Sequence, residues 1–146
     1  MLTGQLYQQL PHSGAMCLID QVLSWDENGI CCSADSHLSP ANPLRENGSL
    51  PGLCALEYAA QALALHGVLN RPQKMSGARY AEAYVVTSQR LAFEAGDLSN
   101  TSESLIITAE LTVRHKESAV YAVNVTIGDS CMLHGDLGVM LSELAG

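Results

Sequence analysis

A glutamate lies inside the most apolar stretch of this sequence. Residues 49–67 read SLPGLCALEYAAQALALHG, and Glu57 is the only acidic residue among them. Burying an unpaired carboxylate costs several kcal/mol, or the pKa rises until the group is protonated. A carboxyl group that stays protonated near neutral pH can act as a general acid. Glu57 is therefore either a functional acid or a buried acid satisfied by Gln61, one helical turn later, or by a backbone group.

A histidine is the natural base to accompany such an acid, because its pKa is near neutral. His37, in SHLSPANPL, is the only histidine between the second expected strand and Glu57. It is either a base or a loop histidine exposed to solvent. His66 lies in the same helix as Glu57 but about half a turn round it at ~100° per residue. We expect it to be a structural residue near the helix C-terminus.

The acid must be positioned by a helix that begins near Pro51 and Gly52, since proline lacks an N–H and fits a first turn. The first amides of that helix, near Gly52 and Leu53, are suited to holding a carbonyl oxygen as charge develops on it. Gly67 followed by Asn-Arg-Pro predicts the end of the helix.

A membrane-spanning role is not expected for this helix. Its apolar run, residues 53–69, is shorter than the ~20 residues that a span requires and contains three polar side chains. A helix that is apolar nearly all round must be covered on most sides. We therefore expect it to be the central helix of a folded domain.

The rest of the chain is typical of strands separated by turns. The expected strands are 16–25, 30–36, 79–93, 105–113, 119–127 and 131–141. Two strands, one long helix and about four further strands predict an α+β domain rather than parallel βαβ units. The whole chain, 1–146, is expected to be a single domain in which an antiparallel sheet of five to six strands wraps round the helix.

Composition limits the partners of the chain. It has 146 residues, 47% of them apolar, and a formal net charge of −8. Such a charge disfavours nucleic acid and anionic membrane surfaces. The five cysteines have no paired spacing, so we expect free thiols in a reducing cytoplasm, with no metal and no cofactor. The N-terminus shows no basic region followed by an apolar one, and a signal peptide is not expected.

Two stretches carry a resemblance to a known family. Residues 10–30, LPHSGAMCLIDQVLSWDENGI, and residues 42–67, NPLRENGSLPGLCALEYAAQALALHG, resemble the hot-dog-fold β-hydroxyacyl-acyl-carrier-protein dehydratases. The sequence is most similar to the dehydratase-like proteins of aryl polyene gene clusters. The resemblance implies a hot-dog fold and dehydration of a 3-hydroxyacyl thioester to the 2-enoyl thioester, in fatty acid or polyene biosynthesis.

The resemblance also implies roles for particular residues. A proline-glycine pair opens the central helix in such enzymes, and Glu57 and Gln61 match their E-x-x-x-Q pattern. Glu57 is thus the implied acid, while Gly52, Leu53 and Gln61 are expected to bind substrate. The family's Gly-His-Phe-Pro-Gly stretch, which carries the base, is absent here. His37 is the expected replacement, unless the chain borrows a base from a partner.

The substrate is expected to arrive on an acyl carrier protein or on coenzyme A. Carrier proteins are acidic, so Arg45, Arg71, Lys74 and Arg79 are candidate docking residues, with a solvated loop as the alternative. The resemblance implies a homodimer, or a heterodimer with a second dehydratase chain. Two other functions remain open: a hot-dog acyl thioesterase, in which Glu57 activates water, and a non-catalytic partner of an active dehydratase.

Overall fold

A computed structural model describes residues 1–10, 14–70 and 80–143. The strands are β1 (Gln21–Asp26), β2 (Gly29–Ala34), β3 (Tyr80–Phe93), β4 (Leu105–Arg114), β5 (Ser118–Ile127) and β6 (Ser130–Glu143). The helices are α1 (Gly4–Tyr7) and α2 (Ala55–Leu69), with short 3₁₀ turns η1 (Gly14–Met16), η2 (Ser36–Leu38) and η3 (Gly52–Cys54). The described residues thus form one long helix and six strands, as the sequence predicts.

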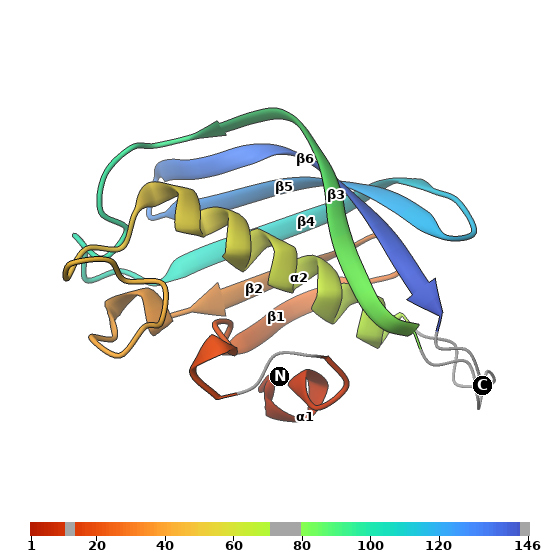
Figure 1. The fold of residues 1–146 in the computed structure, drawn as a ribbon, viewed down its shortest axis with the longest axis horizontal. Helices are drawn as coiled ribbons and strands as arrows, with labels where there is room; N and C mark the ends of the chain where they lie inside the picture. Colours follow the sequence, from red (N-terminus) through yellow and green to blue (C-terminus); the bar gives the residue numbers. More distant parts are fainter. Residues whose placement is uncertain (11–13, 71–79, 144–146) are drawn as a thin grey trace.

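The six strands form one antiparallel sheet in the order β1-β2-β4-β5-β6-β3. Figure 1 shows α2 lying across one face of this sheet, with α1 beside β1. Buried residues alternate along β4 and β5, because only one face of each strand packs against the helix. The core therefore lies between α2 and the sheet, and the α+β class is confirmed.

The first strand begins later than the sequence predicts. Residues 16–20 were expected to be strand, but β1 starts at Gln21 and Gly14–Met16 forms a 3₁₀ turn. Leu18 and Ile19 are buried, but they lie outside the strands, so their amides take no part in the hydrogen bonds of the sheet. Their N–H groups instead donate to the Gln61 side chain and to the Tyr7 hydroxyl. Side chains distant in sequence thus replace the sheet ladder here.

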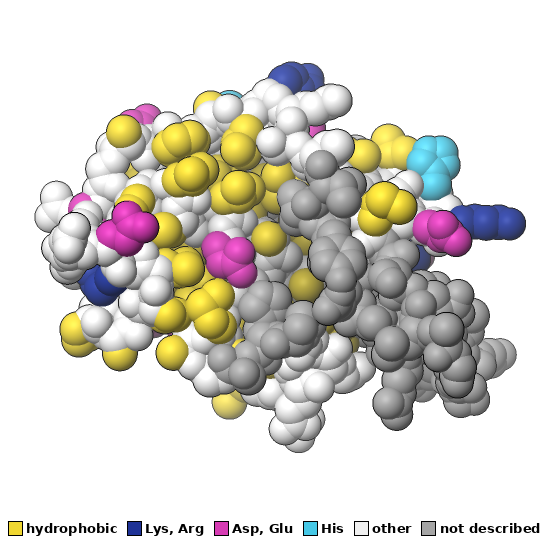
Figure 2. Space-filling view, viewed as in Figure 1, with side chains coloured by type: hydrophobic (Ala, Val, Ile, Leu, Met, Phe, Trp, Pro, Cys, Tyr) yellow, Lys and Arg dark blue, Asp and Glu magenta, His cyan; other side chains and the backbone are white. Residues whose placement is uncertain are grey.

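The central helix is mostly enclosed. The segment Gly52–Leu69 is long and apolar enough to cross a membrane, yet 61% of it is buried inside the fold, as in the core helix of a globular protein. The helix passes through Gly67, where its end was expected, and stops at Leu69. Its residues that are not buried include Leu53, Leu56, Ala60 and Ala64. Figure 2 shows hydrophobic side chains gathered on this face of the molecule.

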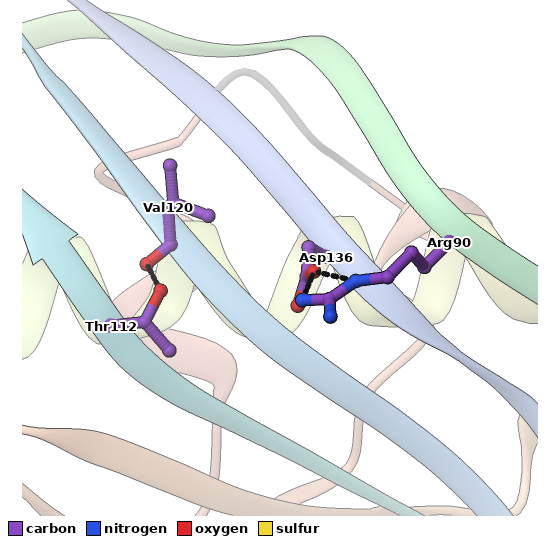
Figure 3. A network of polar contacts seen from close by, with 4 residues as sticks. All are labelled: Arg90, Thr112, Val120 and Asp136. Carbon is purple, nitrogen blue, oxygen red and sulfur yellow. Dashed lines mark hydrogen bonds and ion pairs between the residues drawn. The ribbon is translucent and has the colours of Figure 1, made fainter.

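Strand β3 bends where it pairs with β6. The register shifts between Gln89 and Ala92, and Arg90 adopts a positive φ of 54° at the shift. The exposed Arg90 side chain crosses to β6 and pairs with Asp136, with Nε 3.0 Å from a carboxylate oxygen. Figure 3 shows this contact beside the Thr112–Val120 bond that links β4 to β5. A bulge with a left-handed residue is a usual means of bending an edge strand.

Candidate active site

Glu57 is placed on the first turn of α2 and is half-buried. Its neighbour one turn later, Gln61, donates from Nε2 to Glu57 Oε1 over 3.2 Å. The helix begins immediately before it, at η3, so the carboxyl group lies close to the positive end of the helix dipole. Part of the side chain remains accessible, so a substrate can reach the Glu57 carboxyl group.

Gln61 is fully engaged inside the fold. Its Oε1 accepts from the Tyr7 hydroxyl at 2.6 Å and from the Leu18 amide at 3.0 Å. Its Nε2 donates to the Met16 carbonyl at 2.8 Å as well as to Glu57. Two acceptor sites and two donors are all that a carboxamide has. Gln61 therefore orients Glu57, while the expectation that it binds substrate stays a prediction.

His37 lies in η2 and is completely buried. Its Nε2 is 2.8 Å from the backbone carbonyl of Glu103, just before β4. A carbonyl only accepts, so Nε2 carries the proton and Nδ1 has a free lone pair. Nδ1 is buried and has no hydrogen-bond partner in the part of the chain that the structure describes. Burial lowers the pKa of His37, which keeps the ring neutral and able to accept a proton.

His66 is also completely buried, but both of its ring nitrogens have partners. Nδ1 lies 2.7 Å from the Tyr121 hydroxyl, and Nε2 lies 2.8 Å from the Asp26 carbonyl. This is how a structural histidine satisfies its polar atoms. The unsatisfied nitrogen of His37 is therefore a feature of that residue and not of buried histidines in this fold.

The segment that carries His37 is fastened to the helix beside Glu57. The Tyr58 hydroxyl lies 2.6 Å from Ser36 Oγ and accepts a bond from Asn42 Nδ2 at 3.1 Å. Ser36 and Tyr58 are the chain neighbours of His37 and Glu57. Among the described residues, no hydrogen bond or ion pair joins the His37 ring to the Glu57 carboxyl. One chain thus fixes the two elements to each other without a direct acid–base contact.

A groove of about 750 Å³ opens at the start of the helix, lined by residues that include Gly52, Asp97, Glu103 and Cys131. Gly52 is buried there, and a Cβ at this position would lie 1.8 Å from the Glu94 carbonyl oxygen. Leu53 is 48% exposed beside it. The groove therefore includes Gly52, at the start of η3, and Glu103, whose carbonyl holds the His37 ring. His37 and Glu57 are not part of its lining.

The predicted docking residues divide into two groups. Arg71, Lys74 and Arg79 lie outside the described residues. Arg45 is half-buried, and its guanidinium donates within the loops that surround His37. In the part of the chain that the structure describes, no three His, Cys, Asp or Glu residues gather as metal ligands do.

Sequence reasoning did not find Glu103, Tyr7 or Tyr58. Glu103 acts through its backbone carbonyl, which any residue type would supply, so no sequence signal exists for it. Tyr58 is adjacent to Glu57, but its bond to Ser36 depends on tertiary structure. Tyr7 lies in a four-residue helix far from Gln61 in sequence. Only the residue types at the site, and not their supports, are readable from local pattern.

Comparison with solved structures defines the fold class. The chain is similar to the dehydratase heterocomplex ApeI:P from Xenorhabdus doucetiae, with a TM-score of 0.78 and 20% identity over 93% of this chain and 90% of that one. It is also similar to thioesterase HI1161 from Haemophilus influenzae, with a TM-score of 0.68 and 13% identity over 100% and 94% of the two chains. The fold is therefore a hot-dog fold, which confirms the expectation from sequence.

A third similar structure is a hypothetical thioesterase protein with coenzyme A from Streptococcus pneumoniae TIGR4, with a TM-score of 0.59 and 12% identity over 86% of this chain and 88% of that one. No curated protein sequence matches the chain. The family model of the ApeP-like group, described as ApeP dehydratase, matches residues 5–145. The chain belongs to this ApeP-like dehydratase family.

Proposed function

We propose that this protein dehydrates a 3-hydroxyacyl thioester to the 2-enoyl thioester, with His37 as base and Glu57 as acid. The observation that carries the proposal is the free Nδ1 lone pair of His37. The Glu103 carbonyl fixes the tautomer, burial keeps the ring neutral, and Nδ1 has no hydrogen-bond partner among the described residues. A buried nitrogen without a partner is rare and calls for an explanation, and a substrate proton supplies one.

The reaction needs one proton removed and one supplied. His37 Nδ1 takes the proton from the carbon next to the thioester, and the C–H electron pair forms the new double bond. Protonated Glu57 gives its proton to the hydroxyl on the next carbon, which leaves as water. The first amides of the helix, near Gly52 and Leu53, receive the negative charge that develops on the carbonyl oxygen. Proton return from His37 to Glu57 resets both groups.

We place this chemistry in the cytoplasm, on a thioester of an acyl carrier protein or of coenzyme A. The five cysteines are all free, which supports a reducing compartment. The formal net charge of −8 supports neither nucleic acid nor an anionic membrane as a partner. The proposed catalytic step uses side chains and amides of the protein alone.

A second candidate is a subunit that supports an active dehydratase. The His37 ring has no exposed surface in the single chain and makes no bond to Glu57. A substrate reaches such a ring only if a neighbouring segment moves or if a partner chain completes the site. The similar ApeI:P structure is a heterocomplex, which supports a second dehydratase chain as that partner.

Product analysis tests the proposal. The purified protein is incubated with a 3-hydroxyacyl thioester, alone and together with a candidate second dehydratase chain. Enoyl thioester from the chain alone supports the proposal, and free acid would support the thioesterase alternative, with Glu57 activating water. The subunit role would be supported if enoyl thioester forms only in the presence of an active partner, and if it still forms when His37 of this chain is substituted.

Two substitutions assign the residues. Glu57→Gln keeps the oxygen that accepts from Gln61 but loses the transferable proton, and His37→Gln removes the Nδ1 lone pair. Each should lower turnover by about 10²–10⁴-fold while the fold survives. His115→Gln, at an exposed histidine, is the control and should turn over normally. Near-normal turnover of Glu57→Gln would remove Glu57 from the mechanism.

A further inference from the structure

Arg45 makes four hydrogen bonds around the His37 segment. Its Nε donates to the Ser39 carbonyl at 2.8 Å, and Nη2 donates to the His37 carbonyl at 3.0 Å. Nη1 donates to the Gly48 carbonyl at 3.2 Å and to Ser99 Oγ at 3.1 Å. The side chain is half-buried in this position. All three nitrogens of the guanidinium group are therefore occupied within the protein.

The four acceptors belong to two different loops. Three are backbone carbonyls of segment 37–48, which closes through a tight turn where Asn47 and Gly48 have φ values of 51° and 79°. The fourth belongs to loop 94–104, which also contains Glu103. Arg45 thus holds the backbone of His37 while Glu103, from the second loop, holds its ring.

The second loop is itself fixed to the start of the helix. Ser99 Oγ donates to Asp97 Oδ1 at 2.6 Å, and the same oxygen accepts from the Leu50 amide at 3.1 Å. These bonds, with that of the Ser99 hydroxyl the largest contribution, lower the pKa of Asp97 to about 2. Arg45 therefore links the His37 segment to the loop that packs on Gly52.

Only arginine suits this set of acceptors. Its planar fork presents five N–H groups in fixed directions, whereas lysine presents three donors from a single nitrogen. In arginine, three separate nitrogens bond the carbonyls of Ser39, His37 and Gly48. The single ammonium nitrogen of lysine cannot reach all three carbonyls at once. A cation that serves only to attract an acidic carrier would need no such geometry.

We propose that Arg45 is a positioning residue that holds His37 in place, and that it does not act as a docking cation. The inference rests on the proposed function, in which His37 is the base. It predicts that Arg45 is needed for turnover and for the fixed environment of the His37 ring. The docking alternative predicts that any long cation at position 45 serves equally well.

Arg45→Lys separates these two roles, because it keeps the charge and loses the fork. We expect kcat to fall about 10–100-fold, the size of effect that misplacement of a catalytic group produces. KM and its dependence on salt should stay as in the wild type. Arg114→Lys, at an exposed arginine at the far end of β4, is the matched control and should leave kcat unchanged.

A measurement on the ring itself does not depend on activity. ¹⁵N NMR of the histidine side chains reports the tautomer of His37 and the exchange of its Nε2 proton with solvent. In Arg45→Lys the Nε2 proton should exchange about tenfold faster or more, because the bond to Glu103 opens more often. The His66 signals of the same sample should not change, since no bond connects His66 to Arg45.

Normal kcat in Arg45→Lys, or a lowered kcat with unchanged His37 signals, would overturn the positioning role. A raised and salt-dependent KM with normal kcat in Arg45→Ala would show docking instead. The His37→Gln variant distinguishes failure of the positioning role of Arg45 from failure of the proposed function. If His37→Gln turns over normally, the base assignment is wrong, and the NMR result alone decides whether Arg45 fixes the ring.

Discussion

Gly52 is the residue at which the site tolerates no side chain. A Cβ there would lie 1.8 Å from the Glu94 carbonyl oxygen, a backbone atom that cannot rotate away. Gly67, in the same helical segment, has open space around its Cα. The two glycines therefore allow the same substitution to be compared in a closed and in an open environment.

We expect Gly52→Ala and Gly67→Ala to change stability in opposite directions. Gly52→Ala should lower the free energy of unfolding by about 1–3 kcal/mol, because loop 94–98 must move away from the helix. Gly67→Ala should raise it by about 0.4–1 kcal/mol, because alanine restricts the unfolded chain and favours helix. Urea unfolding measures both values.

Equal stability of Gly52→Ala and the wild type would show that the loop yields at no cost. The close approach would then not constrain the start of the helix. Gly67→Ala serves as the control in that case, because it reports whether alanine has its usual effect in this helix.

Clear turns made two of the strands, β4 and β5, easy to predict from the sequence. β4 and β5 lie within one residue of the expected 105–113 and 119–127, because turn residues bound them on both sides. The expected strand 16–25 begins five residues before the observed β1, because buried Leu18 and Ile19 have the composition of a strand. Their amides bond side chains of Gln61 and Tyr7, which no local pattern reveals.

The candidate site was predictable in part for the same reason. An acid in an apolar helix and a histidine before it are visible in the sequence. The buried environment of His37 depends on the Glu103 carbonyl, which arrives from the start of β4. Charge alone made Arg45 a docking candidate, whereas its four acceptors belong to loops whose paths are set by the fold.

The end of α2 is held by His66, and this contact should make stability depend on pH. Burial lowers the pKa of His66 below its ordinary value of ~6.5. Between the pKa of His66 in the folded chain and its pKa in the unfolded chain, the unfolded chain binds more protons. The free energy of unfolding therefore falls as pH drops through about 6.5. Asp97, with a pKa of about 2, loses its contribution only at much lower pH.

His66→Gln should weaken this dependence. Glutamine can still donate to the Asp26 carbonyl and accept from Tyr121, but it does not titrate. We expect the difference in Tm between pH 7.5 and pH 5.5 to shrink without disappearing, because His37 has a lowered pKa for the same reason. Calorimetry at the two pH values measures it. An unchanged difference would mean that His66 is not protonated on unfolding in this range.

The two edges of the sheet differ. The edge strand β1 is covered by the N-terminus: the Val22 amide donates to the Met1 carbonyl at 2.8 Å, and Leu2 forms a bridge with Gln21. The other edge strand, β3, pairs only with β6 among the described residues. An open edge of this length presents unpaired backbone groups and favours pairing with another chain.

We therefore expect β3 to join a second chain, so that the sheet continues across a dimer. Static light scattering at micromolar concentration should give a mass twice that of one chain. Phe93, at the end of β3, is 46% exposed, and Val113, on β4, is 45% exposed. Phe93→Glu places a charge at the open edge and should weaken the dimer about tenfold or more, whereas Val113→Glu should leave it intact.

The two variants separate edge pairing from general loss of solubility, because both replace an equally exposed apolar side chain with glutamate. A wild-type monomer at micromolar concentration would contradict the homodimer. If such a monomer then forms a stable one-to-one complex with a second dehydratase chain, and Phe93→Glu weakens that complex, β3 is still the interface. Equal effects of Phe93→Glu and Val113→Glu on the dimer would mean that the interface between chains lies elsewhere. The next surface to substitute would then be the helix face that is not buried, formed by Leu53, Leu56, Ala60 and Ala64.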